Sequence, residues 1–192
     1  IYTHANRKNI NKAKRNKMGV RFEQGEVAWM EFQKLYEANL DHNKADPFYY
    51  FSSQYYQMIR ENLETNYVLV SCVMENKIVT SMLIFLGGAF AHCHLIGTDQ
   101  KSKSLGGNNL LHHELILWCK EKKYKFLHIG GGRNSSETDN LYRFKANFSD
   151  KSAKFMIGEN VLNVEKYEEL STQWLQNNQD HPSSHQLLKY RI

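Results

Sequence analysis

Residues 124–148 (YKFLHIGGGRNSSETDNLYRFKANF) constrain the fold more than any other part of the sequence. Their first apolar residues, Phe126, Leu127 and Ile129, suit a buried strand that is too short to be a helix. The three glycines at 130–132 end this run and let the backbone turn sharply, because no Cβ is in the way. The segment therefore predicts a strand at residues 125–129 followed by a tight turn.

A helix is expected directly after this turn. Asp139 stands where an N-cap belongs, since its carboxylate can accept hydrogen bonds from the free amide groups of a first helical turn. Three residues recur at helical spacing and give one apolar face: Leu141, Phe144 and Phe148. Tyr142 and Lys145 lie beside that face. Two interpretations follow: a site for an anionic or carbonyl-bearing ligand, or a tight connection with a solvated lysine.

The middle of the chain predicts an antiparallel meander. Three apolar, valine- and isoleucine-containing runs at residues 67–74, 78–86 and 89–97 are separated by a Glu-Asn-Lys turn and a Gly-Gly turn. In the third run the side chains alternate, so His92 and His94 are expected on one face and Leu95 on the other, with residues 91 and 93.

Two histidine pairs raise the question of a metal. The pair at 92 and 94 has the spacing of a chelate, and a second pair follows at 112–113. No carboxylate stands at a ligand spacing near either pair, so no metal site is predicted.

The loop QKSKSLGGNN leads into a helix expected at residues 109–122. Gly106 and Gly107 before the helix would leave amide hydrogens free at its positive end, which suits an anion. The loop matches neither a Walker sequence nor G-x-G-x-x-G. Phosphate binding by Gly106, Gly107, Asn108 and Asn109 and plain turn chemistry are the two interpretations.

Further elements are predicted on both sides of the meander. Residues 7–17 (RKNINKAKRNK) contain six basic and no acidic residues, which indicates a mostly exposed helix that is either a solvated face or a phosphate-binding surface. Other expected elements are a short strand at 20–22, helices at 26–40 and 53–62, a strand at 153–157 and an amphipathic helix over 167–175. The aromatic run at 48–51 either lines a pocket or fills a core corner. A polar tail is expected at 178–192.

Composition fits one soluble globular domain. The chain has 192 residues, 41% of them hydrophobic, and its net charge of +5 weakly favours anionic partners. The longest apolar run, residues 78–91, is too short for a transmembrane helix. Cys72, Cys93 and Cys119 lie in apolar surroundings, which favours reduced, buried thiols and a cytoplasmic location.

The order of these elements resembles the GNAT N-acyltransferase fold. The resemblance implies an α+β (layered α/β) domain with a mixed, mostly antiparallel central sheet flanked by helices. In that fold the fourth and fifth strands splay apart to admit the acyl donor. A glycine-containing loop before the helix between those strands holds the pyrophosphate of the donor.

A more specific resemblance rests on HIGGGRNSSETDNLYRFKANF, which is similar to the signature of FemAB-like acyltransferases. Their C-terminal halves carry a glycine turn, an Asp-x-Leu step and a Phe-Lys-x-x-Phe segment, here at residues 130–132, 139–141 and 144–148. The basic opening at 6–19 is similar too, so the resemblance spans roughly residues 5–170. FemAB proteins usually contain two such domains. Residues 1–192 are therefore expected to form one GNAT-like domain, either alone or as the C-terminal half of a longer protein.

The resemblance implies an N-acyltransferase that moves an acyl group from acyl-CoA, such as acetyl-CoA, to the amine of a sugar or cell-envelope precursor. Lys145 is expected to contact the acyl carbonyl or a substrate phosphate, with His94 as base and Tyr142 beside them. The donor is expected to be held by Gly106, Gly107, Asn108, Asn109, Gly131, Gly132 and Arg133. The acceptor would be a small or lipid-linked anionic molecule, and no metal takes part.

Two alternatives remain. The loop LGGNN lacks the leading Gln or Arg of the usual acyl-CoA pattern, so an aminoacyl-tRNA could replace CoA as donor in peptidoglycan bridge formation. The other alternative is a non-catalytic module of the same fold that binds nucleic acid or a protein through residues 7–17.

Overall fold

The structure is a computed structural model that describes residues 2–133, 136–154, 156, 158 and 160–178. The chain divides into two compact units, residues 1–150 and 151–192, and each is described by itself. Among the described residues, the first unit contains a sheet and seven helical elements, while the second contains α6 (Val164–Asn177). None of the helices in the described ranges is long and apolar enough to cross a membrane.

A five-stranded sheet forms the centre of the first unit, with its strands side by side in chain order. The strands are β1 (Gly19–Glu23), β2 (Tyr67–Met74), β3 (Lys77–Gly87), β4 (Phe90–Thr98) and β5 (Phe126–His128). The first three pairings are antiparallel and the last, between β4 and β5, is parallel. The predicted meander and the mixed, mostly antiparallel sheet are thus confirmed.

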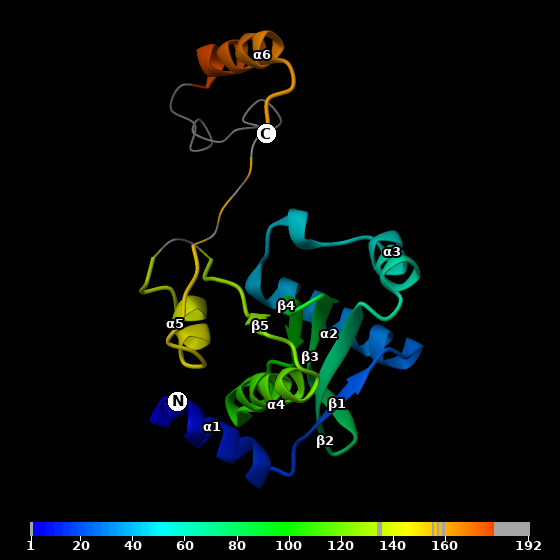
Figure 1. The fold of residues 1–192 in the computed structure, drawn as a ribbon. Coiled ribbons are helices and arrows are strands. Elements are labelled where there is room, and N and C mark those ends of the chain that lie inside the picture. Colours follow the sequence, from blue (N-terminus) through cyan, green and yellow to red (C-terminus); the bar gives the residue numbers. More distant parts are fainter. Residues whose placement is uncertain (1, 134–135, 155, 157, 159, 179–192) are drawn as a thin grey trace. The chain divides into compact units, whose positions relative to one another are not determined.

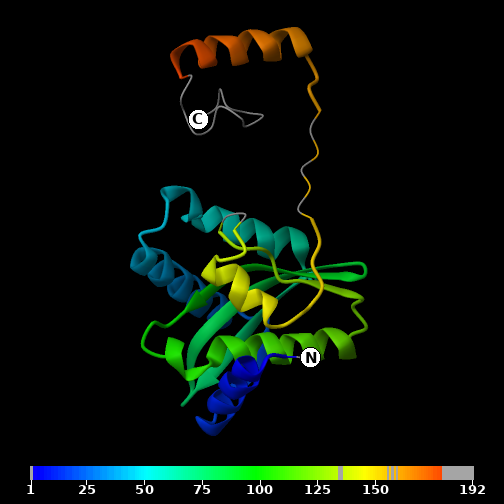
Figure 2. The same ribbon diagram turned by 90° about the vertical axis from the view of Figure 1, so that its left-hand side faces the viewer.

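Helices cover both faces of this sheet (Figure 1). In chain order the helical elements of the first unit are α1 (His4–Arg15), α2 (Glu26–Asn43), η1 (Pro47–Tyr49), α3 (Ser53–Leu63), η2 (Lys103–Leu105), α4 (Gly107–Glu121) and α5 (Asn140–Ala146). Figure 2 shows the sheet between α2 and α3 on one side and α4 on the other, with α1 lying outside α4.

Each face has its own apolar core. The core beneath α4 includes Val70, Ile84 and Leu111 and reaches Ile10 and Ala13 of α1. The core beneath α2 includes Trp29 and Leu83. Burying both faces in this way accounts for the nearly continuous apolar sequence of β2 and β3, in which residues 67–73 and 79–84 are all buried.

The basic helix α1 is mostly exposed, as its composition predicts, but it is attached to α4 by more than its thin apolar stripe. Asn6 is buried, and the amide of Asn109 donates to its side-chain oxygen at 2.9 Å. The ammonium of Lys12 donates to the carbonyl of Ser104 at 2.9 Å. These contacts hold α1 over the start of α4.

The alternation expected along β4 is wrong at Leu95. The register against β3 shifts between Leu83 and Ile84, which pair with Leu95 and Cys93, so His94 is an extra residue in a β-bulge. Leu95 therefore packs against the α2 core, on the side to which His94 also points, while Cys93 packs on the α4 side. A bulge interrupts the two-residue period, and strand patterning alone does not reveal it.

The predicted strand at 153–157 is absent at its described positions, Ala153, Lys154 and Met156, and its other two residues lie outside the described ones. In the aromatic run, Phe51 stacks on Tyr36 and fills the core, whereas residues 48–50 are exposed. The tail expected at 178–192 lies outside the described residues apart from Asn178, which caps α6.

Candidate functional site

The parting of β4 and β5 defines the candidate site. The two strands pair only through Phe90–His92 and Phe126–His128. Beyond His92, β4 continues to Thr98. The segment that follows β5 leaves the sheet and turns at Gly130, whose φ of +77° favours glycine. Within the described part of the chain, the edge of β4 from Cys93 onward has no strand beside it. Its backbone groups are therefore free to pair with an extended ligand.

Lys145 reaches from α5 to the turn at this parting. Its ammonium donates to the carbonyl of Gly131 at 2.9 Å, and a Cβ on Gly130 would lie 2.8 Å from its Nζ. Burial lowers the pKa of Lys145, while the carboxylate of Asp139 opposes that shift. Burial raises the pKa of the neighbouring Cys93 thiol to about 12, so Cys93 stays a neutral thiol. The lysine is thus a partly desolvated cation beside the free edge of β4.

Asp139 fixes the glycine turn to the start of α5. One of its carboxylate oxygens accepts hydrogen bonds from the amides of Tyr142 at 2.8 Å and Arg133 at 3.3 Å, which confirms it as the N-cap. A Cβ on Gly132 would lie 2.6 Å from the same oxygen. Tyr142 is partly buried and the side chain of Arg133 is exposed. Lys145, Tyr142 and the glycines at 130–132 therefore lie together at this turn.

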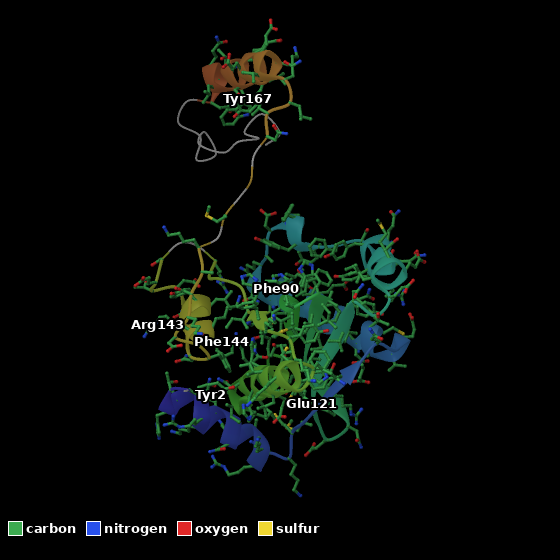
Figure 3. All side chains as sticks on the ribbon, in the orientation of Figure 1. Tyr2, Phe90, Glu121, Arg143, Phe144 and Tyr167 are labelled. Atoms are coloured by element: carbon green, nitrogen blue, oxygen red, sulfur yellow. The ribbon has the colours of Figure 1, made fainter. Side chains whose placement is uncertain are left out.

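A buried histidine anchors the inner face of α5. His112 of α4 stacks on Phe148 with ring centres 5.0 Å apart and meets Phe144 edge-on at 5.3 Å. Its Nδ1 lies 2.8 Å from the carbonyl of Asn108, so this nitrogen carries the hydrogen. Burial lowers the pKa of His112 to about 4, with a smaller contribution from Lys145. Figure 3 shows Phe144 on the inner side of α5 and Arg143 pointing away.

His94, expected as a base, is engaged by α3. Its Nε2 lies 2.5 Å from the hydroxyl of Tyr55, and its ring stacks on Phe85 at 4.3 Å. Burial, and next the neighbouring His92, lower the pKa of His94 to about 4. The imidazole is consequently neutral near pH 7 and has little tendency to take up a proton.

His92 meets a partner from β5 at the last paired position of the two strands. The Nδ1 atoms of His92 and His128 lie 2.7 Å apart, and their rings are nearly parallel with centres 4.8 Å apart. Next to them along the strands, the exposed rings of Phe90 and Phe126 stack at 5.0 Å. Burial, followed by His128 and Lys145, lowers the pKa of His92.

The predicted phosphate-binding residues lie at the start of α4, under α1. Gly106 has a φ of +87°, and a Cβ there would lie 2.3 Å from the carbonyl oxygen of Asn9. Gly107 is buried, and the side-chain oxygen of Asn108 accepts hydrogen bonds from Thr80 at 2.7 Å and Thr98 at 3.1 Å. Contact with a phosphate would therefore come from backbone amides of the first helical turn, which lack intrahelical partners.

Sequence reasoning did not place His128, Tyr55 or His112 at the site. The parallel register of β4 and β5 brings His128 to His92, and α3, distant in sequence, supplies Tyr55. For His112 the available signal was its position just after a glycine-rich helix start. Among the described residues no group of three or more His, Cys, Asp or Glu side chains is close enough to hold a metal.

Comparison with known proteins places this geometry in context. Residues 4–146 match the profile of the family described as "Acetyltransferase (GNAT) domain". No curated protein matches the sequence significantly.

Three solved structures resemble the fold. An aminoglycoside acetyltransferase from an uncultured soil metagenomic sample, in complex with sisomicin, has a TM-score of 0.58 at 13% identity, covering 78% of this chain and 99% of that one. FemX has a TM-score of 0.62 at 8% identity, covering 77% of this chain and 52% of that one. The C-terminal domain of a putative lysylphosphatidylglycerol synthetase from Agrobacterium fabrum has a TM-score of 0.59 at 14% identity, covering 75% and 50%.

Proposed function

Because the chain belongs to the family of GNAT acetyltransferase domains, we propose that it transfers an acyl group from acyl-CoA to an amine. The observation that carries this proposal is the parting of β4 and β5 after three paired residues, with Lys145 placed at the point where they separate. An extended donor arm can add to the free edge of β4 through backbone hydrogen bonds. Its reactive carbonyl would then lie beside the ammonium.

Lys145 supplies charge where the reaction develops it. When an amine attacks a thioester carbonyl, negative charge appears on the carbonyl oxygen, and a fixed cation in a partly dry site stabilises that charge. An ammonium has three N–H donors, and the carbonyl of Gly131 uses one of them. The remaining donors are available for the acyl oxygen or for a substrate phosphate.

The other residues expected at the site take supporting roles in this proposal. Tyr142, on the same helix as Lys145, is assigned to donate a proton to the departing thiolate. His94 was expected as the base from the sequence, but its bond to Tyr55 and its low pKa suit it instead to holding the α3 side of the site in place. Gly131, Gly132 and Arg133 would contact the acyl end of the donor, and residues 106–109 its phosphates.

For the acceptor we propose an aminosugar or an amine of a cell-envelope precursor. The FemAB-like signature at 130–148 supports an envelope precursor, and the fold shared with FemX agrees with it. The aminoglycoside acetyltransferase of the same fold supports an aminosugar. The free thiols Cys72, Cys93 and Cys119 support the cytoplasm as the place of action.

One observation favours a second candidate, in which the donor is an aminoacyl-tRNA. Polar side chains at helical spacing line one outward face of α1, and they include His4, Arg7, Lys8, Asn11 and Arg15. All five are exposed, and helix α1 carries no acidic residue. Such a face attracts phosphodiester backbones through salt-dependent contacts. The same surface would serve the non-catalytic module.

Calorimetric titration separates these candidates. We expect acetyl-CoA to bind the wild-type protein and to raise its melting temperature, since a ligand that binds only the native state stabilises it. A variant with Arg7→Gln, Lys8→Gln and Arg15→Gln serves as the matched control and should bind acetyl-CoA unchanged. Charged tRNA binding without acetyl-CoA binding would favour the second candidate. Binding of uncharged RNA alone, lost in the triple variant, would favour the module.

A further inference from the structure

The cross-strand contact between His92 and His128 is not used by the function proposed above. It lies at the last paired position of β4 and β5, immediately before the strands part. Two Nδ1 atoms at 2.7 Å cannot both carry hydrogen, so one ring donates and the other accepts. His92 is partly buried and His128 is exposed, so the pair connects the site to solvent.

We propose that His92 and His128 form a proton path in which His92 takes the proton from the acceptor amine and His128 passes it to water. The inference rests on the proposed acyl transfer and adds the group that this chemistry lacks. An amine must lose a proton to attack a thioester, and a nearby imidazole is the side chain suited to take it.

Charged and titratable groups surround His92. They are His128 from β5, Lys145 from α5 and His94 of its own strand. His128 is the exposed member of the pair, so it is the ring that can release a hydrogen to water. In the proposed path the hydrogen of the contact therefore lies on Nδ1 of His92, which donates to Nδ1 of His128 and leaves Nε2 of His92 as the free base.

The proton balance follows from this assignment. As the amine nitrogen forms its bond to the acyl carbon, its proton moves to Nε2 of His92. The Nδ1 hydrogen of His92 passes to Nδ1 of His128, and His128 releases its own Nε2 hydrogen to water. The carbon–sulfur bond of the donor breaks and the thiolate takes up a proton. Before the next turnover His128 takes a proton from water at Nε2, its Nδ1 hydrogen returns to Nδ1 of His92, and His92 releases its Nε2 hydrogen to water. The pair is thereby restored, and the net products are the amide and the thiol.

His92 is a better proton acceptor than His94 on geometric grounds. Nε2 of His94 is already bonded to the hydroxyl of Tyr55, and its ring is stacked on Phe85. The partner of His94, Tyr55, is partly buried, whereas the exposed His128 gives His92 a direct route to solvent. The two histidines of β4 therefore have different tasks.

Nitrogen-15 NMR of the imidazole rings tests the pair without any substrate. The protein has nine histidines, and the His92→Gln and His128→Gln variants assign the two signals. We expect hydrogen on Nδ1 and a bare Nε2 for His92 near pH 8, and a shift of the His92 titration when His128 is replaced. Hydrogen on Nε2 of His92, or a titration unaffected by His128→Gln, would overturn the inference.

Steady-state kinetics test whether the His92–His128 pair carries the proton during acyl transfer. With acetyl-CoA and sisomicin or glucosamine as probes, His92→Gln should lower kcat on the order of a hundredfold. His128→Gln should lower kcat less and move the acidic limb of the pH profile, and added imidazole should restore part of its rate. His42→Gln, at an exposed position on α2, is the control and should be unchanged.

The outcomes separate the two proposals. If the wild-type protein is active and both the His92→Gln and His128→Gln variants keep its rate and pH profile, the proton path is overturned and the acyltransferase proposal stands. Loss of acetyl-CoA binding and of transfer in the wild-type protein would overturn the acyltransferase itself. In that case the proton path falls with it, whatever the NMR shows.

Discussion

The ammonium of Lys145 occupies the space that a side chain at Gly130 would fill: a Cβ built there lies 2.8 Å from Nζ. The glycine turn and the helix that follows it are therefore matched to each other. Gly130 provides the left-handed backbone, and its missing side chain leaves room for the cation to reach the carbonyl of Gly131.

Replacing Gly130 should disturb both the turn and the lysine. Gly130→Ala places a side chain at φ +77°, which costs about 1–2 kcal/mol, and displaces Nζ of Lys145. Urea unfolding should show the lost stability. Gly131→Ala is the matched control, because nothing lies within 4 Å of its added Cβ, and its unfolding free energy should change by about 0.5 kcal/mol or less. Equal losses in the two variants would contradict this account.

Lys145→Met should leave the protein folded and lower its turnover. The methionine keeps most of the apolar stem but removes the cation, and loss of one preorganised donor costs on the order of a hundredfold in kcat. Steady-state kinetics with acetyl-CoA measure this, and circular dichroism checks the fold. Lys34→Met, on the exposed side of α2, should keep full activity. Full activity of Lys145→Met would remove Lys145 from the mechanism.

The two glycines at the start of α4 should respond with opposite signs. Gly106→Ala drives a Cβ against the carbonyl of Asn9 at a φ of +87°, so it should destabilise by upwards of about 1 kcal/mol. Gly107→Ala makes only ordinary contacts, the nearest at 3.6 Å, and should stabilise by up to about 1 kcal/mol through helix propensity. Thermal unfolding measures both. A destabilised Gly107→Ala would show that the space beside Cys72 is tighter than these distances indicate.

Stability should fall in mild acid because His112 is held neutral. Its native pKa is lowered to about 4 from 6.5, so the unfolded chain binds a proton below pH 6.5 that the native state refuses. The unfolding free energy should drop between pH 6.5 and about 4, by at most about 1.4 kcal/mol per pH unit from this group. His112→Gln should flatten that part of the profile. His94 shifts the same way, so the difference between variant and wild type is the quantity to compare.

Local signals in the sequence predicted the elements well. The meander, the cap at Asp139 and the helix after the Gly106–Gly107 pair depend on residues that lie near one another in the chain, and the structure confirms all three. The resemblance to the GNAT fold rested on the order of these elements, and the family match over residues 4–146 confirms it.

Contacts between distant segments were not predictable from those signals. The bulge at His94 depends on how β3 and β4 pair, and the meeting of His92 with His128 depends on the parallel register of β5. In the sequence Asn6 is an ordinary polar residue of a basic helix. In the structure it is buried, and its side chain is bonded to the side chain of Asn109 and to the backbone carbonyl of Asn147. Polar burial of this kind requires partners that periodicity cannot identify.

Helix α1 contacts both α5 and the start of α4. Its first turn contacts the end of α5, where Thr3 and Asn6 donate to Asn147, and its middle lies on the start of α4, where Asn9 meets Gly106. If α1 detached, its contacts to the end of α5 and to the start of α4 would be lost together. A fragment that began at β1 would keep all five strands and still lack the helix that ties α5, which carries Lys145, to the proposed phosphate-binding start of α4.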